Sequence, residues 1–230
     1  MVPEKLTYVF VDLFTIIFPL LFSFTKSFDF RTHWRYYFPG NLLIALLFIL
    51  WDIYYTKIGV WGFNLKYTIG VQIFNLPVEE ILFFICIPYA CVFTYYCFRK
   101  FIFAKMKYSF DQFWLILGIV SIVFGIFHYD KLYTSAAFIS CGITLVIAYR
   151  FAKIKFLHFL LFYLIILIPF YIFNGILTGS FMNRIVVFYN NSENLGFRIL
   201  TVPFEDIFYG LALLLSNILL FEFYLHKSTK

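Results

Sequence analysis

Apolar runs long enough to cross a lipid bilayer recur along the whole sequence. A bilayer core of about 30 Å requires roughly 20 apolar residues of α-helix, with shorter runs where a helix breaks around a site. Seven runs fit this requirement, at residues 6–24, 40–55, 77–98, 112–128, 132–149, 156–177 and 203–225. The first run is longer than a signal-peptide core and lacks a small-residue cleavage site, so we expect it to remain as a span.

The composition supports the same class of protein. Hydrophobic residues make up 63% of the chain and charged residues 13%, which excludes an ordinary soluble domain. Aromatic residues reach 25%, more than interfacial belts need, so many rings are expected inside the bundle. Lys and Arg lie almost entirely between the apolar runs. The net charge of +6 therefore reflects membrane topology, and no nucleic-acid partner is expected.

The distribution of basic residues predicts an orientation. When successive loops are assigned to alternate faces, one face collects twelve of the 18 Lys and Arg residues, including those at 105, 107, 153 and 230, and the other face six. Because basic loops stay in the cytoplasm, we expect the N-terminus outside and the C-terminus inside. The expected location is a multi-pass protein of the bacterial cytoplasmic membrane.

An internal repeat organises these spans. Five residues recur 126 positions later: Asn64, Gly70, Pro77, Glu79 and Ile81 match Asn190, Gly196, Pro203, Glu205 and Ile207. Just upstream, Asp52 and Thr56 match Asn174 and Thr178 at a spacing of 122. We therefore predict two parallel three-helix repeats, at residues 1–105 and 131–230. One linker helix within residues 106–130 returns the chain to the starting face.

Each repeat carries a proline followed by two acids at the start of its last helix. The motifs are Pro77-Val78-Glu79-Glu80 and Pro203-Phe204-Glu205-Asp206, which parallel repeats place at one depth near the non-cytoplasmic side. Apolar surroundings and a neighbouring like charge favour the protonated form of a carboxyl. A protonated carboxyl in an aromatic cavity can protonate a carbon–carbon double bond, and a neighbouring carboxylate can take a proton back.

Helix capping explains the same motif without any chemistry, because proline and acids suit the first turn of a helix. Recurrence in both repeats favours a functional role, to which capping contributes. Asp52 and Asn174 lie near the ends of their spans on the same side, so we expect them in or around the site. The fourth and fifth runs carry no evident chemistry and are interpreted as scaffold. No metal spacing and no Gly-rich nucleotide motif is present, so neither a metal nor a redox cofactor is expected.

Together these segments resemble the lycopene cyclases of the heterodimer type. The matching segments are residues 51–52, 59–64, 75–80, 174–179 and 203–206, and the hallmark is Pro-x-Glu-Glu or Pro-x-Glu-Asp in each half. The resemblance covers nearly the whole chain and indicates a fused single-chain member. It implies an isomerase that cyclises the linear ends of lycopene to β-rings, giving γ-carotene and then β-carotene without a cofactor.

The resemblance also implies a set of site residues. Glu79, Glu80, Glu205 and Asp206 are the expected catalytic acids, with the proton-donor role assigned to Glu79 and Glu205. The expected binding or site-shaping residues are Asp52, Trp61, Asn64, Pro77, Asn174, Thr178, Asn190 and Pro203. The implied partners are lycopene or a related linear carotenoid, and membrane lipid.

Two other functions share this layout. A small-solute transporter of the SWEET type has three helices, a linker helix and three more, although a sugar site would require more polar residues on the spans. A carotenoid-binding membrane protein without catalysis would differ from the enzyme only in activity. The sequence leaves open the number of lycopene ends cyclised and the formation of a homo-oligomer.

Overall fold

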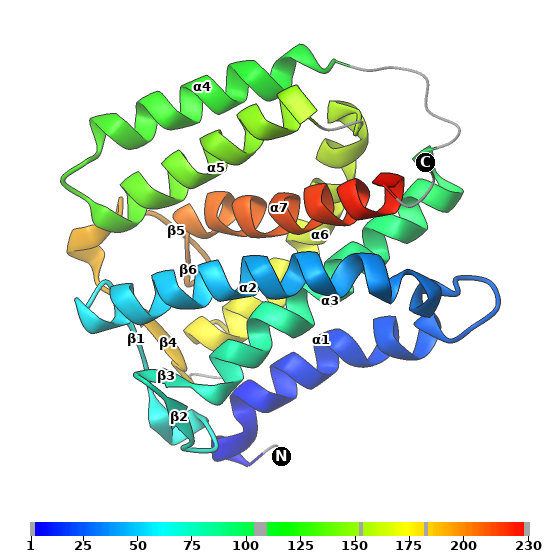
Figure 1. The fold of residues 1–230 in the computed structure, drawn as a ribbon. Coiled ribbons are helices and arrows are strands. Elements are labelled where there is room, and N and C mark those ends of the chain that lie inside the picture. The colour runs from blue at the N-terminus through cyan, green and yellow to red at the C-terminus, as the bar shows by residue number, and fades with distance from the viewer. Residues whose placement is uncertain (1–2, 104–109, 152–153, 182–183, 228–230) are drawn as a thin grey trace.

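A computed structural model describes residues 3–103, 110–151, 154–181 and 184–227. Within these residues the chain forms seven α-helices, shown in Figure 1. They are α1 (Thr7–Ser23), α2 (Trp34–Lys57), α3 (Val78–Phe101), α4 (Gln112–Phe127), α5 (Leu132–Phe151), α6 (Phe156–Thr178) and α7 (Glu205–Lys227). All except α4 are long and apolar enough to cross a membrane. The predicted all-α membrane fold is confirmed.

Two helices depart from the simplest expectation. The predicted start of the second span at residue 40 is wrong, because α2 begins at Trp34 and runs through Pro39. Pro39 is the sixth residue of α2, and the helix continues through it with the loss of one backbone hydrogen bond. The 16-residue α4 is about 24 Å long, shorter than a bilayer core. It packs on α5, where a Cβ added at Gly142 would lie 2.6 Å from the Gly118 carbonyl oxygen.

The two repeats correspond to α1–α3 and α5–α7, with α4 as the linker between them. A short hairpin precedes the last helix of each repeat, β2 (Gln72–Ile73) with β3 (Leu76–Pro77), and β5 (Arg198–Ile199) with β6 (Val202–Pro203). Both hairpins follow a glycine at positive φ, +86° and +73° respectively. The predicted two-repeat architecture is confirmed. The predicted boundary at residues 105 and 106, like Lys105, Lys107, Lys153 and Lys230 of the charge count, lies outside the described residues.

A two-stranded ribbon joins the repeats. Strand β1 (Trp61–Phe63) pairs antiparallel with β4 (Val187–Tyr189), so that Trp61 faces Tyr189, Gly62 faces Phe188 and Phe63 faces Val187. The flanking bonds match: Asn64 N donates to Val186 O at 2.8 Å, and Asn190 N donates to Val60 O at 2.9 Å. This symmetric pairing places a local two-fold axis at Gly62 and Phe188.

The strands gather at one end of the bundle, where α1, α3, α5 and α7 begin (Figure 1). Helices α3 and α7 pack against each other, and α2 packs along both. The acidic motifs therefore start the two central helices, directly beneath the ribbon.

Candidate active site

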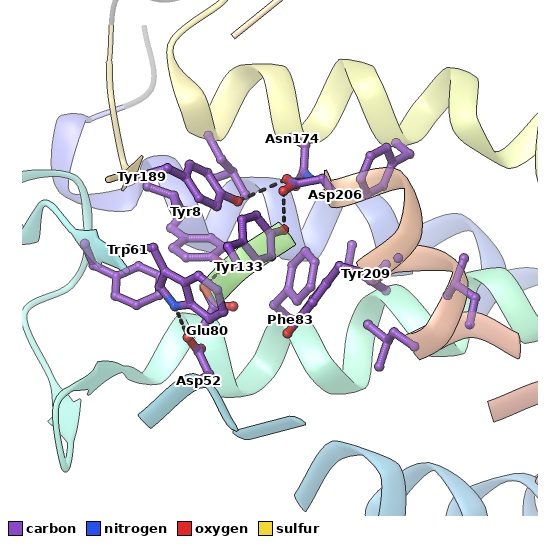
Figure 2. Close-up of a pocket in the computed structure, with 18 residues that line it drawn as sticks. Tyr8, Asp52, Trp61, Glu80, Phe83, Tyr133, Asn174, Tyr189, Asp206 and Tyr209 are labelled. Atoms are coloured by element: carbon purple, nitrogen blue, oxygen red, sulfur yellow. Dashed lines mark hydrogen bonds between the residues drawn. The ribbon is translucent and has the colours of Figure 1, made fainter. Parts of the chain in front are cut away.

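A cavity lies under the ribbon and is lined by side chains from both repeats (Figure 2). Every helix except α4 contributes to it among the described residues. The lining comprises Tyr8, Asp52, Trp61, Phe63, Glu80, Phe83, Ile87, Tyr133, Phe170, Asn174, Leu177, Val187, Tyr189, Asp206, Tyr209, Gly210, Leu213 and Leu214. The described lining residues include three carboxyl groups and no Lys, Arg or His. Arg198, over the Tyr189 ring, acts on Asp206 from outside this lining.

Only the second acid of each motif faces this cavity. Adjacent side chains on an α-helix point about 100° apart, so the two acids of a motif cannot share one direction. Glu80 and Asp206 line the cavity, whereas Glu79 and Glu205 are fully buried outside its lining. The sequence-based hypothesis that Glu79 and Glu205 donate the proton therefore receives no support from this arrangement.

The first acids instead hold the loops that precede the hairpins. Glu79 Oε1 accepts the backbone N–H of Ile69 at 2.7 Å, and Glu205 Oε1 accepts that of Leu195 at 2.7 Å. Glu205 also accepts the Thr134 hydroxyl at 2.7 Å. These matched bonds fix the hairpins, and with them the rotation that turns Glu80 and Asp206 inward.

The first repeat contributes two carboxyls to the cavity. Tyr8 donates its hydroxyl to Glu80 Oε2, and the Trp61 indole N–H donates to Asp52 Oδ1. Among the described residues, no amide or hydroxyl group donates to the other oxygen of Asp52, Oδ2, which is buried. Asp52 and Glu80 lie close enough to interact electrostatically. Like charges at close range favour a shared proton over two carboxylates.

The second repeat contributes one carboxyl with three donors (Figure 2). Tyr133 donates to Asp206 Oδ1, while Tyr189 and the Asn174 amide donate to Oδ2 at 3.0 Å and 3.2 Å. Removal of the Tyr189 hydroxyl from water, and then the negative charge of Asp206, raise the pKa of Tyr189 well above its usual value. The hydroxyl therefore stays a donor, and donated hydrogen bonds stabilise a carboxylate.

Aromatic rings form the walls between the two groups of acids. The Trp61 ring lies 5.1 Å from Tyr133 and 6.3 Å from both Tyr189 and Tyr209, between centroids. Tyr133 stacks on Tyr189 at 5.7 Å. Such faces attract a cation within about 6 Å without offering it a nucleophile. The expectation of interior aromatic residues is met at this cavity.

The remaining predicted residues divide into lining and support. Trp61 and the matched pair Asp52 and Asn174 line the cavity, as expected. Asn64 and Asn190 lie outside it and cap short 3₁₀ turns by accepting the amides of Lys66 and Ser192 at 3.1 Å. Pro77 and Pro203 close the hairpins, and Thr178 donates to the Asn174 carbonyl at 2.8 Å. These five residues lie outside the lining and hold the segments next to it, so their site-shaping role stays a prediction.

The interpretation of the fifth run as scaffold is wrong. Tyr133 and Thr134 begin α5 and bind Asp206 and Glu205, respectively. Tyr8 occupies the equivalent position near the start of α1 and binds Glu80, although the two residues are 72 positions apart in the sequence. The one available signal was a tyrosine near the start of the first helix of each repeat. Tyr189 was not identified either, because it lies in a loop strand rather than a span.

Comparison with known proteins identifies a family for the chain. A family model described as lycopene cyclase matches residues 5–98 and 130–224, one segment in each repeat. Searches of curated proteins and of solved structures found no match. The two matched segments cover most of the chain and leave α4 between them. The family implies an enzyme of carotenoid cyclisation that acts on a linear carotenoid. The chain belongs to the lycopene cyclase family.

Proposed function

We propose that this protein is a lycopene β-cyclase that converts the linear ends of lycopene to β-rings. The observation that carries the proposal is the convergence of Glu80 and Asp206, one from each repeat, on an aromatic cavity whose described lining residues include no basic side chain. A cyclisation started by a proton needs an acid, a base and a wall that does not attack a carbocation. This cavity offers all three.

The reaction is redox-neutral, and its atoms balance without a cofactor. A carboxyl proton adds to the terminal double bond and leaves a tertiary cation. The C5–C6 double bond attacks that cation and closes the ring. Loss of the C6 proton to a carboxylate then forms the ring double bond, so one proton enters and one leaves for each ring.

We assign the proton-donor role to Glu80, supported by Asp52, and the base role to Asp206. The pair in the first repeat is suited to hold one proton, because two adjacent carboxylates repel each other. Asp206 accepts three hydrogen bonds, which suits a carboxylate ready to accept a proton. Glu79 and Glu205 then act as positioning residues through the hairpin loops.

The aromatic walls serve the intermediate cations. Trp61, Tyr133 and Tyr209 line the cavity, and an aromatic face is worth about 0.5–2 kcal/mol to a cation. A wall that excludes water also prevents capture of the cation as an alcohol. The proposed orientation places this end of the bundle on the non-cytoplasmic side of a bacterial membrane, because the opposite face carries more Lys and Arg.

The test is expression in a non-native host that accumulates lycopene, with pigments separated by chromatography and membrane protein levels matched. Wild type is expected to yield γ- or β-carotene. Glu80→Gln and Asp206→Asn should each lower conversion by at least about a hundredfold, the scale of acid–base catalysis. Glu79→Gln and Glu205→Gln are the matched controls, since an amide oxygen can still accept the loop N–H.

The controls decide the assignment of roles. Full loss in Glu79→Gln or Glu205→Gln, with normal conversion in Glu80→Gln and Asp206→Asn, would return the chemistry to the first acids. Lycopene left unchanged by well-folded wild type would overturn the lycopene assignment.

A further inference from the structure

A second cavity continues from the candidate active site into the membrane core. It lies among α1, α3 and α6, with one residue from α7, and shares six lining residues with the first cavity: Phe83, Ile87, Phe170, Asn174, Leu177 and Leu214. Its far end is marked by Pro19 and Thr94. From Phe83 to Thr94, α3 rises about 16 Å, roughly half the thickness of a bilayer core.

We call this second cavity the α1–α6 groove. Its wall is apolar toward a ligand, because its polar groups are already hydrogen-bonded. Its two hydroxyl groups are bound to their own helices: Thr15 donates to Val11 O and Thr94 to Ala90 O, both at 2.8 Å. Each threonine is thus left with no free hydroxyl hydrogen for a ligand. The amide of Asn174, at the shared end, is used by Asp206. A ligand of the groove therefore gains from apolar contact alone.

Small side chains and two prolines within helices leave room for the α1–α6 groove. Ala90, Cys91 and the two threonines leave space along α1 and α3, and α1 and α6 each contain a proline within the helix, Pro19 and Pro169. On the outer surface α1 and α6 expose Phe14, Phe18, Ile168 and Ile172. The flanks of the groove are therefore suited to hydrocarbon.

The repeat symmetry supplies a comparison. The related position between α2 and α5 also has a depression, lined by residues such as Trp51, Tyr55 and Ser140, but it shares no lining residue with the acid cavity. There α2 packs closely along α7, and the Trp51 ring contacts Tyr209 at 5.0 Å. Helix α6 packs much less on α3. Among the described residues, the α1–α6 groove therefore shares lining with the acid cavity and reaches into the membrane core, whereas the α2–α5 depression shares none.

We propose that the α1–α6 groove binds the polyene chain of the carotenoid while one chain end reacts at Glu80 and Asp206. This inference rests on the proposed function and specifies where the rest of the same substrate lies. The reacting end occupies the aromatic cavity, and the conjugated chain extends along α3 past Ile87 and Ala90. Beyond the groove the chain passes between α1 and α6 into lipid, so the far end of the molecule needs no pocket of its own.

The test uses a matched pair of substitutions. Thr15 and Ser140 lie two helical turns after Tyr8 and Tyr133, each is partly buried, and each donates to its own helix backbone. Thr15→Phe fills the α1–α6 groove, whereas Ser140→Phe adds a ring to the α2–α5 depression. In the lycopene-accumulating host we expect Thr15→Phe to lower cyclised product by roughly tenfold to a hundredfold. Ser140→Phe should stay near wild type.

A binding measurement separates this inference from the proposed chemistry. The same two changes are made in Glu80→Gln protein, which is purified in detergent and scored by absorbance for bound lycopene per protein. Ser140→Phe should retain lycopene and Thr15→Phe should lose it. Equal retention by both, or equal loss in both, would overturn the groove assignment whether or not wild type cyclises lycopene. Wild type without cyclase activity but with this difference in retention would overturn the chemistry alone.

Discussion

The two halves of the cavity are built on one plan but differ at several matched positions, and one of these is the neighbour of the second acid. The first repeat has Asp52 beside Glu80, where the second has Asn174 beside Asp206. Asp52 gives Glu80 a competing negative charge, while Asn174 gives Asp206 a donated hydrogen bond at 3.2 Å. This exchange of carboxyl for amide, together with the Tyr189 hydroxyl that donates to Asp206, makes one half suited to hold a proton and the other suited to accept one.

Among the variants that test this difference between the halves, single substitutions at Asp52 and Asn174 should have the largest effect on lycopene conversion. Asp52→Asn removes the charge that favours a proton on Glu80, and Asn174→Asp removes a donor from Asp206 and adds a charge. We expect each single change to lower lycopene conversion by roughly a hundredfold, within the range of general acid–base catalysis. The measurement is pigment conversion at matched protein levels.

The double variant Asp52→Asn with Asn174→Asp sharpens the comparison. If the neighbour of each acid determines its role, the roles exchange, and conversion should exceed that expected from two independent losses. A double variant at or below the product of the single effects would show that roles depend on other features of each half.

The matched tyrosines Tyr8 and Tyr133, at the starts of α1 and α5, should differ in their effect on catalysis. Tyr133 donates to Asp206, proposed as a carboxylate, and Tyr8 donates to Glu80, proposed as protonated. Hydrogen bonds to charged groups contribute about 1.5–3 kcal/mol and neutral ones about 0.5–1.5 kcal/mol. Tyr133→Phe should therefore lower kcat by roughly tenfold to a hundredfold, and Tyr8→Phe by less than about tenfold. Equal effects in reconstituted membranes would contradict the assigned charge states.

Alanine substitutions at Glu79 and Glu205 should affect the stability of the protein more than its cyclase activity. Glu79→Ala leaves the Ile69 amide without its acceptor, and Glu205→Ala leaves both the Leu195 amide and the Thr134 hydroxyl without theirs. One unsatisfied buried donor costs about 1–3 kcal/mol, so Glu205→Ala should lower Tm further than Glu79→Ala. Thermal unfolding in detergent checks the order. The reverse order would mean that the Thr134 bond contributes little.

The smallest effect is expected at the hairpin glycines. Gly70 and Gly196 have φ of +86° and +73°, and a Cβ at either would meet no atom within 4 Å. Alanine should therefore cost only backbone strain, about 1–2 kcal/mol at each position. The two variants should have the same Tm within error. A clear difference between them would show that the hairpins are not equivalent.

Sequence patterns predicted the repeat, both acidic motifs and the matched pair Asp52 and Asn174, because each depends on identity at constant spacing. They could not predict which acid of a motif faces the cavity. That depends on the rotation of α3 and α7, which we attribute to the bonds that Glu79 and Glu205 accept from loop amides ten residues upstream. The tyrosines were missed for a related reason, since Tyr8 and Glu80 meet through the packing of α1 on α3 rather than through any local motif.

The β1–β4 ribbon restricts which repeats can pair with each other. In a dimer of identical chains, a residue on the two-fold axis meets its own copy. Here the axis passes between Gly62 and Phe188, and a Cβ added at Gly62 would lie 2.5 Å from Phe188 Cζ. In a dimer of two first repeats, Gly62 would pair with a second Gly62 and no ring would fill the space between them. In a dimer of two second repeats, two Phe188 rings would clash. The pairing of β1 with β4 therefore favours one copy of each repeat.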